Sequence, residues 1–420
     1  MMSQAMRERV PYDVVNDIFG LLPVKSLTRF RSVSKTCNSI ISDPTFISTH
    51  FNLNLTKSLT STNTHSGYLL YTPTVTVTVT EDHSSSTSKQ LCTVVCNDPT
   101  LPPVSKFEIP SIFDEFSIVG FCNSVFCLAR YDQDLNHIIY LWNPSIRKFK
   151  KLRSTLFLYS NVSVVFGFAF DSKNNDFKVL RLVTFRERKP QAEAEIYTLS
   201  TDSWRKVILT MESLRGYEPN FGSIVSIVPR SVFCNGALHF IANTCVHHFI
   251  LSFDVHDETF HEMKMPLPQN YSLSFQLAVF KGLLAIIYFF HGLCHFWVME
   301  EYGVVGSWTR KFLIPMDSPH DFYCCTDNGE LIFKSANGLV SINPPRSRSI
   351  LAIEDANWVG FSANSMESLV LLDQGTLRRI VGVETWKPPV RPNPNQASSH
   401  FPPPSHPLSN NVLGSHDAST

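Results

Sequence analysis

The start of the chain carries apolar side chains at helical spacing. Those of the first predicted helix are Val14, Val15, Ile18, Phe19 and Leu22. They recur at intervals of three and four residues, so they lie on one face of an α-helix. Pro11 suits the first position of this helix, and Pro23 ends it.

Two further helices are predicted before the chain reaches Thr45. The second begins at Pro23, and its apolar stripe consists of Val24, Leu27, Phe30 or Arg31, and Val33. The third has Ser34 as its N-cap and continues through Cys37, Ile40 and Ile41. The sequence SDP at 42–44 ends it, because the residue before a proline avoids the helical conformation.

A helical unit of this size buries too little surface to be stable alone and normally needs a metal, a disulfide or a partner. Residues 8–50 contain neither metal-ligand spacing nor paired cysteines. Two interpretations are therefore open on physical grounds. The helices dock either on the domain that follows or on another protein.

From Tyr68 to Leu372 the pattern changes to short alternating apolar runs separated by Gly, Asn, Asp or Pro, which predicts an all-β domain. The purest alternation is TVTVTVT at 74–80. A turn followed by an apolar strand recurs as CNSVFCL (122–128), CNGALHF (234–240), FKGLLAI (280–286) and DNGELIF (327–333). Ser124 stands where the other copies have Gly, so a positive φ there would strain the turn.

A second recurring element, strand, polar turn and strand, sets the period of the domain. Its equivalent positions are Val95, Trp142, Tyr197, Phe253, Val298 and Ile342, which are 47, 55, 56, 45 and 44 residues apart. Such lengths are typical of four-stranded propeller blades. Six copies predict a closed β-propeller of about six blades, since closure removes open sheet edges. An open sandwich built of hairpins is the alternative.

Composition and targeting signals narrow the function further. Lys+Arg and Asp+Glu both total 36, so no net charge favours nucleic acid or anionic lipid. The start of the chain lacks an apolar secretory signal, and the longest apolar region, 277–299, is broken by Lys281-Gly282 and His291-Gly292. Ten cysteines lack a disulfide spacing, so we expect reduced thiols and a cytoplasmic and/or nuclear location. Residues 386–420, rich in Pro, Ser, Asn and His, predict a disordered tail.

No spacing of residues predicts a catalytic, cofactor or metal site. The one Cys/His cluster of interest is CVHH at 245–248, and adjacent histidines in a strand point to opposite faces. We therefore expect no catalytic residue, no cofactor and no metal. The chain divides into a three-helix unit at 8–50, a β domain at 51–385 and the tail at 386–420.

The pattern VPYDVVNDIFGLLPVKSLTRFRSVSKTCNSIISDPTFISTH (10–50) resembles the F-box, in particular that of the large plant F-box proteins. The matching residues are Pro11, Ile18, Leu22 to Leu27, Arg29 to Arg31, Val33, Lys35, Ile40, Ile41, Asp43, Pro44, Phe46 and His50. Val10 stands where the family usually has Leu. Cys37 stands where it usually has Trp, which removes a large aromatic ring from the third helix.

The resemblance implies that the helical unit packs on a Skp-family adaptor, which links it to a cullin-RING ubiquitin ligase. The expected adaptor-binding residues are Pro11, Val14, Ile18, Leu22, Pro23, Val24, Leu27 and Val33. Some of these must instead hold the helices together. The basic residues Lys25, Arg29, Arg31 and Lys35 either complement an acidic adaptor or form a solvated helix face.

The β domain resembles the plant F-box-associated domain, which is sometimes described as kelch-like. The matches include WNPSIRKF (142–149), FGFAFDSKNNDFKVL (166–180), ILSFDVHDETF (250–260) and MESLVLL (366–372). The resemblance implies a non-catalytic substrate-recognition subunit of a Skp-cullin-F-box E3 ubiquitin ligase, which supplies proximity for another protein's chemistry. The alternative is a stand-alone propeller that binds a glycan or small ligand; an enzyme built on a propeller is disfavoured. The candidate target-binding loops are Arg186 to Glu193, Met211 to Ser223 and Asp317 to Cys324.

Overall fold

The computed structural model of the chain describes the helical start and the strands of the β domain. The described ranges are 11–60, 67–73, 91–96, 103–108, 116–131, 137–155, 162–185, 192–209, 224–245, 247–266, 275–316, 322–335, 338–344, 347–351, 353, 356–362 and 367–372. The predicted alternation at 74–80, most of the three candidate loops and the predicted tail at 386–420 lie outside these ranges.

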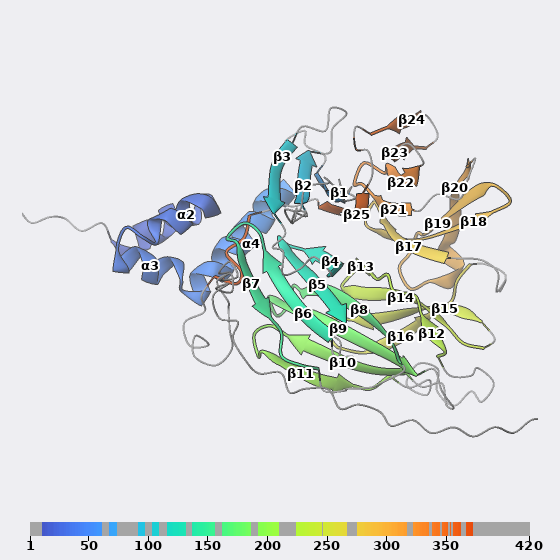
Figure 1. Cartoon of the computed structure of the whole chain (residues 1–420), viewed down its shortest axis with the longest axis horizontal. Coiled ribbons are helices and arrows are strands. Elements are labelled where there is room, and N and C mark those ends of the chain that lie inside the picture. The colour runs from blue at the N-terminus through green and yellow to red at the C-terminus, as the bar shows by residue number, and fades with distance from the viewer. Residues whose placement is uncertain are drawn as a thin grey trace, which may run out of the picture. The chain divides into compact units, whose positions relative to one another are not determined.

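Four helices open the chain, at the blue end of Figure 1. They are α1 (Tyr12–Gly20), α2 (Val24–Phe30), α3 (Lys35–Ile41) and α4 (Pro44–Thr60). Pro11 and Pro23 are the N-cap residues of α1 and α2. Ser34 is the N-cap of α3, as predicted, and its Oγ accepts a hydrogen bond from the Cys37 backbone N–H at 3.0 Å.

The fourth helix was not predicted, because Asp43-Pro44 was interpreted only as the end of the third. The Asp43 carboxylate accepts hydrogen bonds from the backbone N–H groups of Thr45 (2.7 Å) and Phe46 (3.3 Å). Pro44 then occupies the first helical position, where a missing N–H costs nothing. The same two residues therefore end α3 and begin α4, which continues past residue 50.

The helices share one apolar core. Its buried members are Phe19, Val24, Leu27, Ile40, Ile41, Phe46, Ile47, Leu369 and Leu372. Leu369 and Leu372 come from the far end of the described chain, more than three hundred residues after α4. Cys37, at the family's Trp position, is partly buried and packs against this core.

The β domain is a six-bladed propeller, and Figure 1 shows its sheets following one another around the domain. From the innermost strand outward, the first blade is β25 (Ala356–Ser362), β1 (Tyr68–Pro73), β2 (Leu91–Cys96) and β3 (Pro103–Glu108). The second is β4 (Ser117–Cys122), β5 (Val125–Tyr131), β6 (His137–Asn143) and β7 (Lys148–Lys151). The third is β8 (Val162–Asp171), β9 (Asp176–Phe185), β10 (Ala192–Thr198) and β11 (Ser203–Val207).

The fourth blade starts with two short strands, β12 (Ser226–Ile227) and β13 (Val232–Cys234), both paired to β14 (Ala237–Asn243), and continues with β15 (His248–Asp254) and β16 (Phe260–Met263). The fifth is β17 (Phe275–Phe280), β18 (Leu283–Phe290), β19 (Leu293–Met299) and β20 (Trp308–Pro315), with the 3₁₀ turn η2 (Val305–Ser307) before β20. The sixth is β21 (Phe322–Cys325), β22 (Leu331–Ser335), β23 (Gly338–Asn343) and β24 (Ser347–Ile350).

The predicted period matches the blades. The six equivalent positions all lie on the third strand of their sheets, namely Val95 on β2, Trp142 on β6, Tyr197 on β10, Phe253 on β15, Val298 on β19 and Ile342 on β23. The repeat therefore describes one strand position in each blade, and the alternative of an open sandwich is excluded.

The recurring turns join the innermost strand of a blade to the second. Asn235 and Gly236 have φ values of 51° and 78°, and Lys281 and Gly282 have 50° and 79°. In the second blade Asn123 and Ser124 have φ values of 47° and 68°. Ser124 therefore adopts a positive φ, a conformation that costs a side-chain-bearing residue roughly 1 kcal/mol.

Ring closure depends on the first blade. Its innermost strand, β25, comes from the C-terminal side of the domain and pairs antiparallel with β1, with Leu69 opposite Phe361 and Tyr71 opposite Val359. On its other sides β25 contacts β21 and β4, the innermost strands of the sixth and second blades. A buried cluster of Leu69, Val95, Ile332, Leu339, Ile353, Ala356 and Val359 fills the junction of the first and sixth blades.

Two further features of the described residues bear on the sequence predictions. None of their helices has the length and apolar content needed to cross a membrane. Nine cysteines are recorded as free thiols, and burial raises the pKa of Cys92, Cys122 and Cys294 to about 12.

Opening the ring should destabilise the whole domain. In Val359→Asp a carboxylate replaces a side chain that is 5% exposed between two blades, and we expect the free energy of unfolding to fall by at least about 3 kcal/mol. Asn357→Asp, at an exposed position of the same strand, is the control and should cost less than about 1 kcal/mol. Urea unfolding followed by circular dichroism measures both, and equal losses would contradict the closure argument.

Candidate functional site

The helical unit exposes large apolar side chains. They are Tyr12, Val14, Ile18, Leu21, Phe30 and Val33, and we call this set the exposed helical surface. Val14, Ile18 and Leu21 follow the i, i+4, i+7 spacing along one face of α1 and the residue that ends it. Their exposed fractions are 44%, 50% and 70%, whereas Phe19, which follows Ile18 and lies at the other edge of the predicted apolar stripe, is 6% exposed in the helical core. Apolar side chains gathered in this way indicate a protein-binding surface.

The structure sorts the eight predicted adaptor-binding residues into two groups. Pro11, Val14, Ile18, Pro23 and Val33 are exposed, and Leu22 is partly buried against the helical core. Val24 and Leu27 are 1% and 0% exposed, so both are corrected to internal core residues. The sequence prediction allowed that some of the eight residues hold the helices together, and it could not know that Leu369 and Leu372 belong to the same core.

The exposed helical surface also contains residues that the sequence prediction missed. Tyr12 and Leu21 were not among the predicted contacts, and Phe30 was assigned to the internal stripe of α2. The spacing of Leu21 from Val14 and Ile18 is the signal that would have found it. Of the four basic residues, Lys25, Arg29 and Lys35 are exposed, and the Arg31 Nε donates a hydrogen bond to Asn38 Oδ1 at 3.0 Å.

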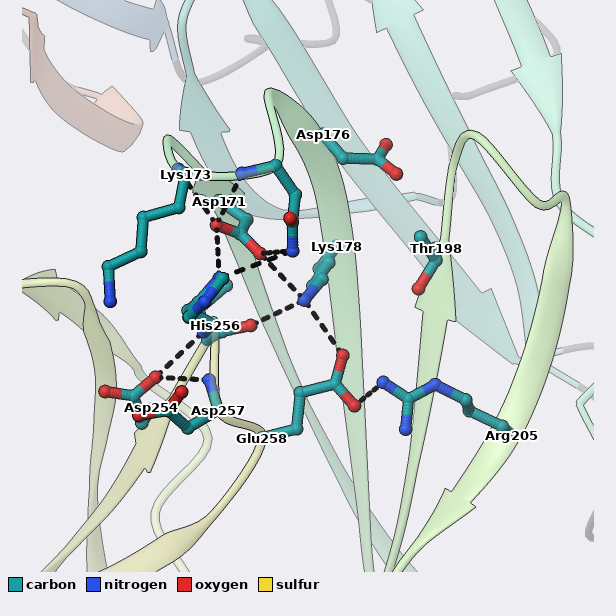
Figure 2. Close-up of polar contacts among 12 residues, drawn as sticks. Asp171, Lys173, Asp176, Lys178, Thr198, Arg205, Asp254, His256, Asp257 and Glu258 are labelled. Carbon is teal, nitrogen blue, oxygen red and sulfur yellow. Dashed lines mark hydrogen bonds and ion pairs between the residues drawn. The ribbon is translucent and has the colours of Figure 1, made fainter.

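A buried polar cluster joins the third and fourth blades, and Figure 2 shows it between the β8–β9 turn and the β15–β16 turn. Lys178, 4% exposed on β9, donates from Nζ to Asp171 Oδ2 at 2.9 Å, to Glu258 Oε1 at 2.8 Å and to the Val255 carbonyl oxygen at 2.7 Å. Arg205 of β11 forms an ion pair with the second oxygen of Glu258. Two blades are thus tied by one ammonium group.

The cluster is built for structure rather than for chemistry. All three Lys178 N–H bonds are used, so the ammonium has no donor or lone pair left for a substrate. Burial by itself raises the pKa of the Asp171 carboxyl, but hydrogen bonds from Lys178 and Asn174 outweigh it and hold the pKa below its usual value. An ionised carboxylate on a charged lysine is a stable inter-blade contact.

Removing the ammonium should destabilise the propeller. In Lys178→Met the carboxylates of Asp171 and Glu258 lose their shared cation, and we expect a loss of about 3–5 kcal/mol in the free energy of unfolding. Lys173→Met, an exposed neighbour in the β8–β9 turn, is the matched control and should change it by less than about 0.5 kcal/mol. Thermal unfolding of both variants measures the two losses. A Lys178→Met protein as stable as the Lys173→Met control would refute the role of Lys178 in holding the two blades together.

The innermost strands of the propeller surround a cavity of about 1230 Å³. Each blade contributes to its lining, for example Trp358, Phe121, Phe166, Arg230, Gln276 and Tyr323 in blade order. Arg230 Nη1 donates a hydrogen bond to the Phe322 carbonyl oxygen at 2.9 Å, which links the fourth blade to the sixth. The guanidinium of Arg130 lies 5.0 Å from the centre of the Phe116 ring. A cavity of this size, lined by both apolar and polar side chains, can hold a ligand or a peptide segment.

Two buried histidines, His137 at this cavity and His239 in the fourth blade, are neutral at physiological pH. Burial, helped by the charge of Arg181, lowers the pKa of His137 to about 4. Burial also lowers the pKa of His239 to about 4, and its Nε2 lies 2.8 Å from the Tyr302 hydroxyl oxygen. Of the CVHH stretch, His247 Nδ1 lies 2.9 Å from Thr244 Oγ1, and His248 Nδ1 lies 2.5 Å from Asn243 Oδ1. Across the described residues no three His, Cys, Asp or Glu side chains gather as metal ligands would.

These two pKa values predict a pH dependence of stability. Between pH 6.5 and 4 the unfolded chain binds protons on His137 and His239 that the folded protein does not, so stability should fall as the pH falls through this window. Each histidine should contribute about 1.4 kcal/mol per pH unit. His239→Phe should reduce the slope, whereas His261→Phe, at an exposed position of β16, should leave it unchanged. Urea unfolding at pH 4.5, 5.5 and 6.5 tests this, and an unaltered slope in His239→Phe would contradict it.

An exposed apolar surface on a small helical unit, joined to a propeller with its own cavity, defines a two-part binding protein. The comparisons with known proteins give its family. Residues 61–341 match the family model described as the F-box associated beta propeller domain, and residues 8–49 match that of the F-box domain. The chain belongs to the family of F-box proteins that carry the F-box-associated β-propeller domain. This organisation is typical of substrate receptors of Skp-cullin-F-box ligases.

Similar proteins align with this chain over most of their own length. The chain is 29% identical to the F-box protein At3g07870 of Arabidopsis thaliana, with 79% of each chain covered. It is 28% identical to the F-box/kelch-repeat protein At3g23880 of the same plant (73% of this chain, 79% of the relative) and 26% identical to its F-box protein CPR1 (73% of each). Among solved structures, TolB from Acinetobacter baumannii is matched with a TM-score of 0.42 and 12% identity, over 76% of this chain and 73% of TolB. A likeness at that level says nothing about function.

Proposed function

We propose that this protein is the substrate-recognition subunit of a Skp-cullin-F-box E3 ubiquitin ligase. In this proposal the F-box helices bind a Skp-family adaptor, and the propeller recruits a protein target for ubiquitination and degradation. The role is non-catalytic: the subunit holds the target close to chemistry done elsewhere in the complex. A cytoplasmic and/or nuclear location remains a prediction that goes with this role.

The observation that carries the proposal is the exposed helical surface within a matched F-box. Val14, Ile18 and Leu21 remain about half or more exposed although the helices have a core of their own. Burying the exposed part of each such side chain against a partner contributes on the order of 1 kcal/mol. Exposed Lys25, Arg29 and Lys35 lie on α2 and at the start of α3, so an adaptor with an acidic surface would fit beside this apolar face.

Topology supports one end of the propeller as the target-binding end. The helical unit contacts the opposite end, since Asn175 in the β8–β9 turn donates a hydrogen bond to Ser48 Oγ of α4, and Ile146 in the β6–β7 turn packs against the helical core. Because successive strands run antiparallel, the connections β9–β10, β11–β12 and β20–β21 all leave the other end. These connections contain the three loops that the sequence indicated as candidates.

A second candidate function has one observation in its favour. The central cavity of about 1230 Å³ is large enough for a glycan or small ligand, as a stand-alone binding propeller would require. This alternative does not need the exposed helical surface to bind anything. Adaptor binding therefore separates the two functions.

The test is co-expression of the full chain with a Skp-family adaptor, followed by size-exclusion chromatography. Ile18→Asp places a carboxylate in the exposed helical surface without touching the core, and co-elution should fall at least tenfold. Ile208→Asp, 72% exposed beyond β11, is the matched control and should co-elute like the wild type. Wild-type chain that elutes alone, or an Ile18→Asp variant that still co-elutes fully, would overturn the adaptor role and favour the stand-alone propeller.

A further inference from the structure

The segment Glu367–Leu372, which follows the last strand of the propeller, lies between the helices and the blades. We call it the C-terminal strap. Glu367 Oε2 accepts a hydrogen bond from the backbone N–H of Val24 at 2.9 Å, across 343 positions of sequence. Val24 is the first residue of α2, and its N-cap, Pro23, makes no side-chain cap hydrogen bond. Glu367 therefore satisfies a helix-end donor that the helix's own sequence leaves open.

The side chains of the C-terminal strap divide between the two parts of the protein. Leu369 and Leu372, each 1% exposed, belong to the core of the helical unit. Val370 and Leu371, 9% and 8% exposed, belong to the core that the second and third blades share with Phe51 of α4. A six-residue segment thus fills two cores at once, and neither core is complete without it.

The backbone of the C-terminal strap is fixed as firmly as its side chains. Asn143, at the end of β6 and 0% exposed, donates from Nδ2 to the carbonyl oxygens of Ser368 at 2.9 Å and Val370 at 2.7 Å. Leu371 has a φ of 72°, a left-handed conformation that a bulky residue adopts only when its surroundings enforce it. The strap is therefore held in a specific conformation, at a local cost in backbone energy.

A second joint lies at α4. The Phe51 ring is 5.1 Å from that of Phe170 on β8 in an edge-to-face arrangement, and 6.2 Å from that of Phe177 on β9. Phe170 lies near the end of β8 and Phe177 near the start of β9, on either side of the β8–β9 turn. Lys178, the centre of the buried polar cluster, follows Phe177 directly. The helical unit is consequently attached to the propeller through chain segments on both sides of the domain in sequence, α4 before β1 and the C-terminal strap after β25.

We propose that the C-terminal strap is a positioning element, which locks the F-box helices to the propeller so that the two move as one rigid body. Its consequence for ubiquitination rests on the proposed function: a target on the propeller would be presented at a fixed place relative to the adaptor. A flexible joint would spread the target over many positions and lower its effective concentration at the acceptor site. The lock itself does not depend on adaptor binding.

The experiment compares four full-length variants with the wild type by calorimetry and by hydrogen exchange. Leu369→Ala with Leu372→Ala withdraws the strap from the helical core, and the single unfolding transition expected of the wild type should split into two. Glu367→Ala removes only the cap, so exchange of the Val24 amide should become about five- to tenfold faster while the blades stay unchanged. Glu367→Gln keeps an acceptor and should restore most of the protection, and Glu301→Ala, at an exposed glutamate, is the control.

Two readouts separate a lock from ordinary packing. Small-angle scattering of the double variant should show a broader distribution of interatomic distances, with circular dichroism of the β domain unchanged. One transition in the double variant, together with wild-type exchange at Val24 in Glu367→Ala, would overturn the proposal. Adaptor binding is measured separately on each protein. A wild-type chain that does not bind the adaptor but unfolds in one transition would refute the proposed function without contradicting the role of the C-terminal strap.

Discussion

The pairing of β25 with β1 is the interaction on which the rest of the structure depends. It closes the ring of six blades. It also places the first and the last strand of the domain side by side, with Tyr68 opposite Ser362. Since α4 leads into the domain shortly before Tyr68 and the C-terminal strap leaves it shortly after Ser362, both joints to the helical unit arise at the same blade.

The buried charges of the propeller follow from the same architecture. A charged group buried between blades is stable when partners of opposite charge and hydrogen bonds replace its water. Lys178 meets this requirement with two carboxylates and one carbonyl. Within the third blade, Arg181 and Glu195 face each other at 2.5 Å, 1% and 0% exposed. Lys178 uses all three of its N–H bonds within its cluster, and the Arg181–Glu195 ion pair is buried inside its blade, where the Arg181 Nε has no hydrogen-bond partner among the described residues.

In the proposed function the chain binds two proteins, and each of its two parts offers a surface for one of them. The helices keep Val14, Ile18 and Leu21 on the surface because Leu369 and Leu372 help to fill the core from inside. The propeller keeps one end free of the helical unit because the β6–β7 and β8–β9 turns at the other end receive it. The proposed function thus assigns each surface to one partner, and the proposed lock sets the geometry between them.

The sequence by itself determined the helices around Val14 to Ile41 and the repeat that marks the third strand of every blade, because each depends on local periodicity. It could not determine α4, since Asp43-Pro44 ends one helix and begins the next. It also could not show that Val24 and Leu27 are internal or that Tyr12 and Leu21 are exposed. Those outcomes depend on contacts between segments hundreds of residues apart, such as Glu367 with Val24 and Phe51 with Phe170. Side chains of the same apolar type become core or binding surface according to what the folded chain lays over them, and only the tertiary structure decides that.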